Sequence, residues 1–219
     1  MNILLTNDDG IQSPGIIELK DRLSVDHQVW VFAPESERSG FSHTVTIRGP
    51  IAVREAGERM YALRGTPADC ILVALKGFVD VDFDIIVSGI NRGPNLGTDI
   101  IYSGTAAGAR QGALMGIPSV AASICGRDAF DRISFPAEFI SRNLDRFREL
   151  WDPFHFLNIN FPVTSKPGTR VVVTFPSRRI YYDRLHRFKA PDGYEYCFFE
   201  GDEPSASYTK GSDDDAVKQ

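Results

Sequence analysis

Short apolar runs recur along the first three quarters of the chain, and each of them ends in polar, glycine or proline residues. A continuous apolar run of this kind, bounded by turn residues, is typical of a strand that is buried on both faces of a sheet. We interpret as strands the runs at residues 3–5, 28–33, 83–87, 117–124, 156–162 and 170–175.

Helical spacing of apolar residues separates several of these runs. One apolar face is formed by Ile16, Leu19 and Leu23, and a second by Ile140, Leu144, Phe147 and Trp151. Strands that alternate with helices predict parallel pairing with right-handed connections. We therefore expect an α/β fold, a Rossmann-like three-layer sandwich with a mostly parallel sheet.

Residues 44–63 show a different pattern, because apolar and polar residues alternate and β-branched types are frequent. This alternation predicts a small antiparallel insert of two or three short strands, at 44–47, 51–53 and 60–63. A helix start follows, where Thr66 is the expected N-cap, Pro67 takes the first helical position and Asp69 completes a capping box. We expect this helix to end near Gly77.

The character of the chain changes again after residue 175. Arginines and tyrosines dominate residues 178–187, and one more strand is predicted at 194–199. We expect residues 1–175 to form a Rossmann-like catalytic core, and residues 176–219 to form a C-terminal β-hairpin arm of the same domain. Aromatic residues in such a stretch more often pack in subunit interfaces than bind a cofactor, so the arm is expected to make oligomer contacts.

Composition narrows the class of protein. The chain has 219 residues, a formal net charge of −5 and three cysteines. An acidic balance argues against binding to a nucleic-acid polymer, although a bound metal ion would still permit nucleotides. An odd cysteine count without pairing spacing indicates a reducing compartment, which we take as the cytoplasm. No apolar run is long enough to span a bilayer and no signal peptide is evident, so no membrane association is expected.

Asp8 and Asp9 follow the first predicted strand directly, and Gly10 completes the turn. The carboxyl ends of strands in an open α/β sheet form the edge where ligands bind. Two adjacent carboxylates repel each other, and a hard divalent cation such as Mg²⁺, Mn²⁺ or Ca²⁺ relieves that repulsion. Taken alone, an Asp-Asp-Gly stretch is more often a solvated turn.

Two further loops leave strands at the same edge. The first contains Ser39 before Gly40, where a serine without further support is simply a turn residue. The second, at residues 88–99, contains Asn91 and Asn95 among several glycines and prolines. His43 follows the first loop, and its expected role is that of a hydrogen-bonded structural histidine.

Small residues at 103–109 predict a helix that packs close to the sheet, with Ser103 as its N-cap. Free backbone N–H groups at Gly104 and Thr105, two hydroxyl groups and the positive end of the helix dipole make an anion site, for which phosphate is the usual ligand. An ordinary capped helix is the alternative interpretation of this segment.

With these residues in place, the sequence closely resembles the SurE family, the stationary-phase survival proteins. The resemblance covers nearly the whole chain, and the matching segments occur in the family's order. They are residues 3–10 (Ile-Leu-Leu-Thr-Asn-Asp-Asp-Gly), 33–34 with 38–40, 65–70 (Gly-Thr-Pro-Ala-Asp-Cys), 87–97 (Val-Ser-Gly-Ile-Asn-Arg-Gly-Pro-Asn-Leu-Gly), 102–105 and 157–160 with Pro162.

The resemblance implies a divalent-metal-dependent phosphatase that hydrolyses nucleoside 5′- and 3′-monophosphates and extends to short polyphosphate. It implies one Mg²⁺ or Mn²⁺ ion in each subunit and a homodimer or homotetramer. Carried over residue by residue, it gives the metal ligands as Asp8, Asp9, Ser39 and Asn91. It also gives Asn95, Ser103, Gly104 and Thr105 as the residues that bind phosphate.

The chemistry that we expect is metal-assisted hydrolysis of a phosphate monoester, with Asp8 and Asp9 as the catalytic residues. Either carboxylate could take the proton from water, and attack on phosphorus by an aspartate is the alternative. A signalling receiver domain also begins with a strand and an acidic pair. It needs an aspartate at the end of its third strand, and residues 48–54 contain none. A dinucleotide-binding fold would need a glycine-rich turn in place of the acidic pair.

Overall fold

A computed structural model describes residues 1–126, 130–201, 205–206 and 209–218 of the chain. The contacts within it divide the chain into two compact units. The first unit comprises Met1–Asn95 and Asp99–Val171, and the second comprises Leu96–Thr98 and Val172–Gln219.

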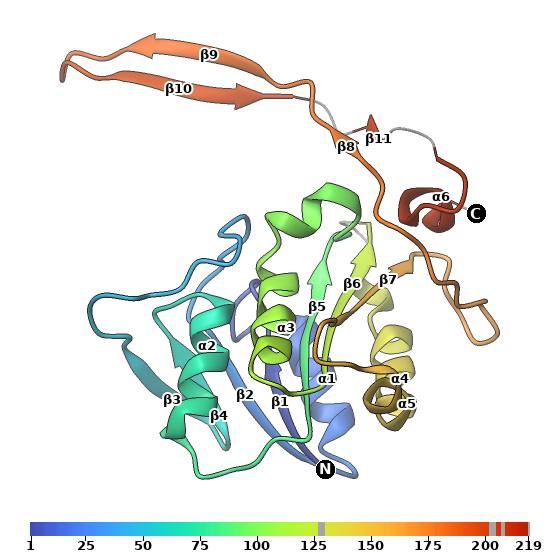
Figure 1. Ribbon diagram of the computed structural model, residues 1–219. Helices are drawn as coiled ribbons and strands as arrows, with labels where there is room; N and C mark the ends of the chain where they lie inside the picture. Colours follow the sequence, from blue (N-terminus) through green and yellow to red (C-terminus); the bar gives the residue numbers. More distant parts are fainter. Residues whose placement is uncertain (127–129, 202–204, 207–208, 219) are drawn as a thin grey trace. The chain divides into compact units, whose positions relative to one another are not determined.

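The first unit is built on a seven-stranded sheet with the order β3-β4-β2-β1-β5-β6-β7 (Figure 1). All neighbouring strands are parallel except β3, which runs antiparallel to β4. This arrangement confirms the predicted mostly parallel sheet with a small antiparallel insert. The strands are β1 (Asn2–Thr6), β2 (Gln28–Pro34), β3 (Val53–Gly57), β4 (Met60–Leu63), β5 (Ile85–Arg92), β6 (Ser119–Cys125) and β7 (Leu157–Pro162).

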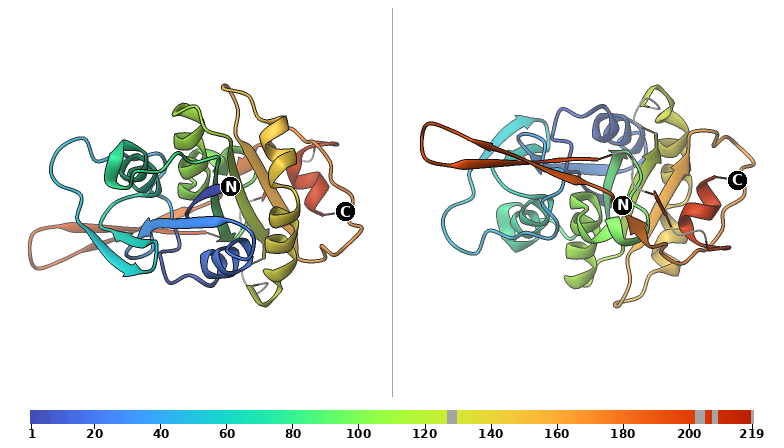
Figure 2. Two further views of the ribbon diagram at one scale, coloured as in Figure 1. Left: turned by 90° about the horizontal axis from the view of Figure 1, so that it is seen from below. Right: turned by 90° about the horizontal axis from the view of Figure 1, so that it is seen from above.

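Helices cover both faces of the sheet, as Figures 1 and 2 show, and a separate apolar cluster lies under each helical layer. The Rossmann-like three-layer architecture is therefore confirmed. One layer contains α1 (Pro14–Leu23), α4 (Ser134–Arg142) and α5 (Leu144–Leu150). The other contains α2 (Pro67–Val73), which continues into the π-helical turn η1 (Ala74–Phe78), and α3 (Gly104–Leu114). Two 3-10 turns, η2 (Gly97–Ile101) and η3 (Phe130–Arg132), lie in the connections.

Helix α3 lies unusually close to the sheet, as its small residues predicted. A Cβ atom at Gly108 would come within 2.7 Å of the Thr6 methyl group and 2.8 Å of the Ser88 hydroxyl. Since real Cβ contacts are longer than this, only glycine fits between the helix and strands β1 and β5. The close approach places the first half of α3 against the end of β1 and the middle of β5.

The prediction of a strand at residues 44–47 is wrong, because this segment has no strand pairing. Its polar groups bond to helix α2 instead of to a neighbouring strand. The Thr46 N–H and hydroxyl donate to the Asp69 carboxylate at 2.7 and 2.8 Å, and the Thr66 hydroxyl donates to the Thr44 carbonyl at 2.6 Å. Threonines that bond in this way compete with a strand ladder. The capping box of Thr66 and Asp69 is confirmed.

Three other boundaries differ from the expectations. Residues 170–175 form no strand, although one was predicted there. Val173 is fully exposed, so the apolar residues of this segment do not belong to a buried core. The expected helix over 140–151 is broken at Asn143, whose side chain donates to the Phe139 carbonyl at 2.7 Å. Strand β5 continues beyond Val87 to Arg92, with a shift of register between Ser88 and Asn91.

The second unit contains an antiparallel hairpin of β9 (Arg184–Lys189) and β10 (Glu195–Glu200), as the C-terminal sequence predicted. It also contains the short pair β8 (Arg179–Ile180) and β11 (Ser205–Ala206) and the terminal helix α6 (Asp213–Val217).

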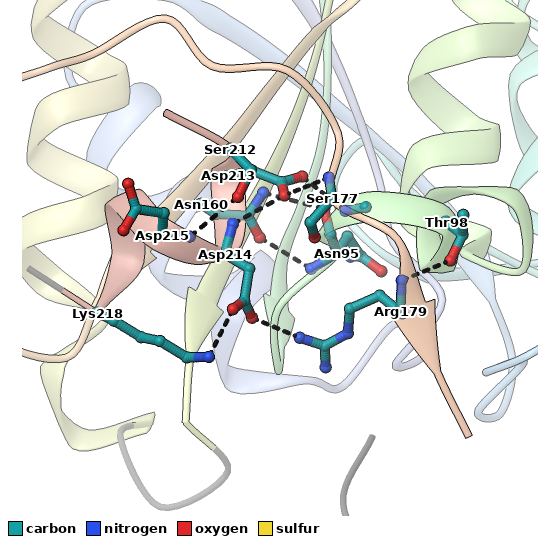
Figure 3. A network of polar contacts seen from close by, with 11 residues as sticks. Asn95, Thr98, Asn160, Ser177, Arg179, Ser212, Asp213, Asp214, Asp215 and Lys218 are labelled. Carbon is teal, nitrogen blue, oxygen red and sulfur yellow. Dashed lines mark hydrogen bonds and ion pairs between the residues drawn. The ribbon is translucent and has the colours of Figure 1, made fainter. Parts of the chain in front are cut away.

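The start of helix α6 holds two other segments of this unit, around Gly97 and at 177–179 (Figure 3). Asp213 accepts hydrogen bonds from the backbone N–H groups of Gly97 and Ser177, at 2.6 and 2.8 Å. The next residue, Asp214, is paired with Arg179 at 3.0 Å and Lys218 at 2.5 Å. The acidic run at the end of the sequence is therefore a folded element with assigned partners. No described helix is both long enough and apolar enough to cross a membrane.

Candidate active site

The strand order places the acidic pair at a switch point of the sheet. Strand β1 lies between β2 and β5, and the chain fills the sheet in opposite directions from there. The carboxyl ends of parallel strands at such a point form a crevice where ligands bind. Asp8 and Asp9 follow β1, the loop of residues 35–40 follows β2, and Asn91 lies near the end of β5.

Three hydrogen bonds hold these segments to the acidic pair. The Arg38 N–H donates to the Asp8 carbonyl at 2.7 Å, which brings in the loop after β2. The Arg92 N–H donates to the Asp9 carboxylate at 3.3 Å, which brings in the end of β5. The Thr105 hydroxyl donates to the Asp8 carboxylate at 2.5 Å, which brings in helix α3. Segments far apart in the sequence therefore meet at two adjacent residues.

The N-terminus of α3 holds the Asp8 carboxylate. Ser103 is the N-cap, as predicted, and its hydroxyl accepts a hydrogen bond from the Ala106 N–H at 2.9 Å. A Cβ atom at Gly104 would lie 2.7 Å from the Asp8 Cβ, so a larger residue there would push the two elements apart. Burial raises the pKa of Asp8, while hydrogen bonds from Thr105 and Gly104 oppose that effect. The Asp8 side chain therefore lies against the first turn of α3.

Asp9 is more accessible than Asp8, and its environment is also unfavourable for a negative charge. Burial, followed by the neighbouring charge of Asp8 and a smaller effect of Glu37, raises the pKa of Asp9 to about 6. A bound cation would relieve this repulsion, and the oxygen-only chemistry of the pair fits a hard divalent ion. Among the described residues no three or more His, Cys, Asp or Glu side chains form a metal-binding group, so neutral oxygen atoms would have to complete the site.

Ser39 and Asn91 are the neutral candidates. Ser39 is exposed, and its hydroxyl donates to the Glu37 carboxylate at 2.8 Å. Asn91 donates through its side-chain nitrogen to the Gly93 carbonyl at 2.9 Å, which leaves its side-chain oxygen as the atom for a ligand. Glu37 is not among the site residues predicted from the sequence, although its place two residues before Ser39 in the same loop was a usable signal.

Asn95 is buried and held by the last two strands of the sheet. Its N–H donates to the Asn160 side chain at 2.8 Å, a bond that Figure 3 shows. The side chains of Asn158 and Asn160 donate to its carbonyl, at 2.9 and 3.1 Å. Its own side-chain nitrogen donates to the Ser123 hydroxyl at 2.8 Å, so its side-chain oxygen stays available. The alternating asparagines of β7 were noted in the sequence without a role, yet their spacing puts both on one face of a strand.

His43 is hydrogen-bonded, as expected for a structural histidine. Its Nε2 atom lies 2.9 Å from the Gln111 side-chain oxygen, and its Nδ1 atom lies 3.4 Å from the Arg110 guanidinium. Both partners belong to α3, so His43 fastens the segment after the Ser39 loop to that helix.

A comparison with known families agrees with this arrangement. A family model described as "Survival protein SurE" matches residues 3–183. The chain belongs to the SurE family. A Pseudothermotoga lettingae protein named "5′-nucleotidase SurE" is 44% identical, and the match covers 92% of this chain and 79% of that protein. A protein of the same name from Kosmotoga olearia is 43% identical, with 92% and 82% covered.

A solved structure is also similar. The crystal structure of the SurE protein from Aquifex aeolicus superposes with a TM-score of 0.84 at 33% sequence identity. The match covers 100% of this chain and 89% of the Aquifex chain. The similarity therefore includes described residues of both units.

Proposed function

We propose that this SurE protein is a divalent-metal-dependent 5′-nucleotidase that hydrolyses nucleoside 5′- and 3′-monophosphates to nucleoside and inorganic phosphate. The observation that carries the proposal is the convergence of three segments on Asp8 and Asp9, through Arg38, Arg92 and Thr105. Family membership and the names of the curated relatives support the same activity.

In this proposal, one Mg²⁺ or Mn²⁺ ion in each subunit is held by Asp8, Asp9, Ser39 and Asn91. Two carboxylates, a hydroxyl and an amide oxygen are hard ligands of the kind that these ions prefer. When bound, such an ion would make a water molecule more acidic and would polarise the phosphoryl oxygen.

The protein's own groups bind and orient the phosphate. The side-chain oxygen of Asn95 is held in place by β6 and β7, and the N-terminus of α3 contributes its dipole at Ser103, Gly104 and Thr105. The hydroxyl of Thr105 already donates to Asp8, so this residue links the phosphate-binding helix end to the acidic pair. Asp8 and Asp9 are the catalytic residues, and one of them accepts the proton of the attacking water.

The direct test is a panel of phosphate esters, assayed with a chelator and again after Mg²⁺ or Mn²⁺ is restored. We expect release of inorganic phosphate from nucleoside monophosphates in the presence of the ions and none in the chelator. If the purified protein leaves every nucleoside monophosphate intact with both ions, the proposed activity is wrong. Short polyphosphate belongs in the same panel as a further substrate.

We further propose that the protein is a cytoplasmic homodimer or homotetramer and that residues 176–219 make subunit contacts. The hairpin supports the assembly, because all residues of β9 and β10 are exposed in the single chain. Free thiols at Cys70, Cys125 and Cys197 are consistent with a reducing compartment.

A further inference from the structure

Two exposed rings flank the candidate active site on the first unit. Phe41 follows the Ser39 loop and is 44% exposed, and Tyr102 directly precedes the N-cap Ser103 and is 61% exposed. Single exposed apolar residues are ordinary on a protein surface. These two differ because each lies within a few residues of a segment that is hydrogen-bonded to Asp8.

The backbone brings the two residues side by side. The Ser42 N–H donates to the Tyr102 carbonyl at 3.0 Å, and the Ser42 hydroxyl donates to the Ile101 carbonyl at 2.6 Å. Among the described contacts, the Tyr102 hydroxyl makes no hydrogen bond that would hold its ring against the protein. The N–H and hydroxyl groups of Ser42 are already bonded to the carbonyls of Tyr102 and Ile101. This surface therefore offers a ligand two aromatic side chains that are partly or mostly exposed.

The segment that carries Phe41 is fixed at both sides. His43 is held by Gln111 and Arg110 of helix α3, and Thr46 is held by the buried Asp69 of helix α2. A segment that is held by hydrogen bonds on both sides of Phe41 loses little further conformational entropy when a ligand binds.

A positive charge completes the surface. The guanidinium of Arg38 lies 5.3 Å from the centre of the Phe41 ring, and the Arg38 N–H is the one bonded to Asp8. A cation on one face of an aromatic ring stabilises the ring's position and adds a positive potential beside the acidic pair. Arg38 thus connects the acidic pair, to which its N–H is bonded, with the aromatic rings, one of which its guanidinium contacts.

From this arrangement we propose that Phe41 and Tyr102 form the subsite for the base of the substrate. The inference rests on the proposed nucleotidase function. A nucleoside monophosphate has an anionic end and an aromatic end separated by a ribose, and the surface shows the complementary order. Stacking on aromatic rings tolerates every base, because each base has a π-face. The subsite would therefore select nucleotides over small phosphate esters without selecting one base.

The test compares adenosine 5′-monophosphate with ribose 5-phosphate, which has the same phosphate and sugar but no base. We expect Phe41→Ala and Tyr102→Ala each to lower kcat/KM for the nucleotide roughly five- to a hundred-fold, mainly through KM. Hydrolysis of ribose 5-phosphate should change by less than about two-fold. Tyr102→Phe should behave as the parent, since it keeps the ring. Phe154→Ala is the matched control, because Phe154 is 90% exposed and lies in the connection before the amino end of β7.

A second measurement does not depend on turnover. Calorimetric titration of the chelator-treated protein with adenosine should show binding that weakens in Phe41→Ala and Tyr102→Ala and is unchanged in Phe154→Ala. Equal losses for both substrates, or unchanged nucleotide kinetics, would overturn the base subsite. A change of oligomeric state with equal losses would instead place the rings in a subunit interface and also overturn it. If the parent hydrolyses neither ester, the nucleotidase proposal fails, while the adenosine titration still decides the subsite.

Discussion

The sheet of the first unit and the β9–β10 hairpin of the second are both rich in large apolar residues, but they place them differently. Leu4 and Leu5 of β1 are fully buried between two helical layers. In the hairpin, Phe188 is 59% exposed and Phe199 is 78% exposed. A sheet covered on both faces has a complete core, whereas a two-stranded hairpin cannot bury either of its faces by itself.

The comparison shows where each region can contribute to function. Because the helical layers bury the strands, the side chains of the candidate site lie at the strand ends and in the loops that follow them. The hairpin carries no comparable polar site among its described residues, and its exposed rings are suited to contact with another surface. This difference supports the proposal that the first unit carries catalysis and the second carries assembly.

The largest expected effect tests the assignment of catalysis. Asp8→Asn keeps the shape of the side chain but removes a charge from the acidic pair. It should lower kcat by roughly three powers of ten or more, because ion binding and water activation fail together. The matched control is Asp192→Asn in the hairpin turn, where the carboxylate accepts a hydrogen bond from the Tyr194 N–H at 3.0 Å. Steady-state kinetics and a Mn²⁺ titration should show an unchanged control, and tight Mn²⁺ binding by Asp8→Asn would contradict the ligand assignment.

The second prediction tests the assignment of assembly. Phe188 and Phe198 lie on neighbouring strands of the hairpin, with their ring centres 5.7 Å apart. Replacing both by serine should shift a dimer or tetramer to the monomer of 24.3 kDa, because the exposed apolar face is lost. Light scattering at micromolar concentration measures this. Phe154→Ser removes an exposed ring from the first unit and should leave the assembly unchanged; a parent that is already monomeric would refute the proposal.

Sequence and structure agree best where the signal is local. The apolar run before Asp8, the capping box of Thr66 and Asp69 and the N-cap at Ser103 depend on neighbours within a few residues, and all three are confirmed. The strand expected at 44–47 failed for the opposite reason. Thr46 bonds to Asp69 and the Thr44 carbonyl accepts from Thr66, both more than twenty residues away, and nothing in the alternation of the segment shows such partners.

The candidate site shows the same limit. Family resemblance singled out Thr105 as a phosphate ligand, but only the fold shows that its hydroxyl donates to Asp8, 97 residues away. Likewise, the position of Asn95 in its loop was enough to predict it as a site residue. The asparagines that hold it belong to β7, the edge strand of the sheet, and lie more than sixty residues further along the chain. The sequence therefore indicates which residues could bind a ligand, but the residues that hold them in position can be identified only from the order of the strands in the sheet.

The third prediction tests one of those supports. Asn160→Ala removes the acceptor of the Asn95 N–H and one donor to the Asn95 carbonyl, so Asn95 should lose its position beside the site. We expect kcat/KM to fall roughly ten- to a hundred-fold, the loss typical of a misplaced binding group. Asn158→Ala removes one donor only and should cost less. Thermal unfolding of both variants separates a local effect from loss of the fold, and equal kinetics for the two variants would argue against a positioning role.

The smallest expected effect asks whether the acidic pair weakens the first unit when no ion is bound. The pKa of Asp9 is raised from 3.8 to about 6, so its charge disfavours the folded state. The metal-free protein therefore loses stability as the pH rises from about 4 through 6, and the loss is complete above that range. Because Asp9 is partly exposed, we expect this loss to be only about 1 kcal/mol, or a shift in Tm of about 2–4 °C.

Chelator-treated Asp9→Asn should accordingly melt above the chelator-treated parent near pH 7.5 and together with it near pH 4. Addition of Mn²⁺ should reverse the order, since an ion that binds only the folded state stabilises the parent more. Calorimetric scans at the two pH values measure this, and a metal-free variant that melts below the parent at the higher pH would show that Asp9 stabilises the fold.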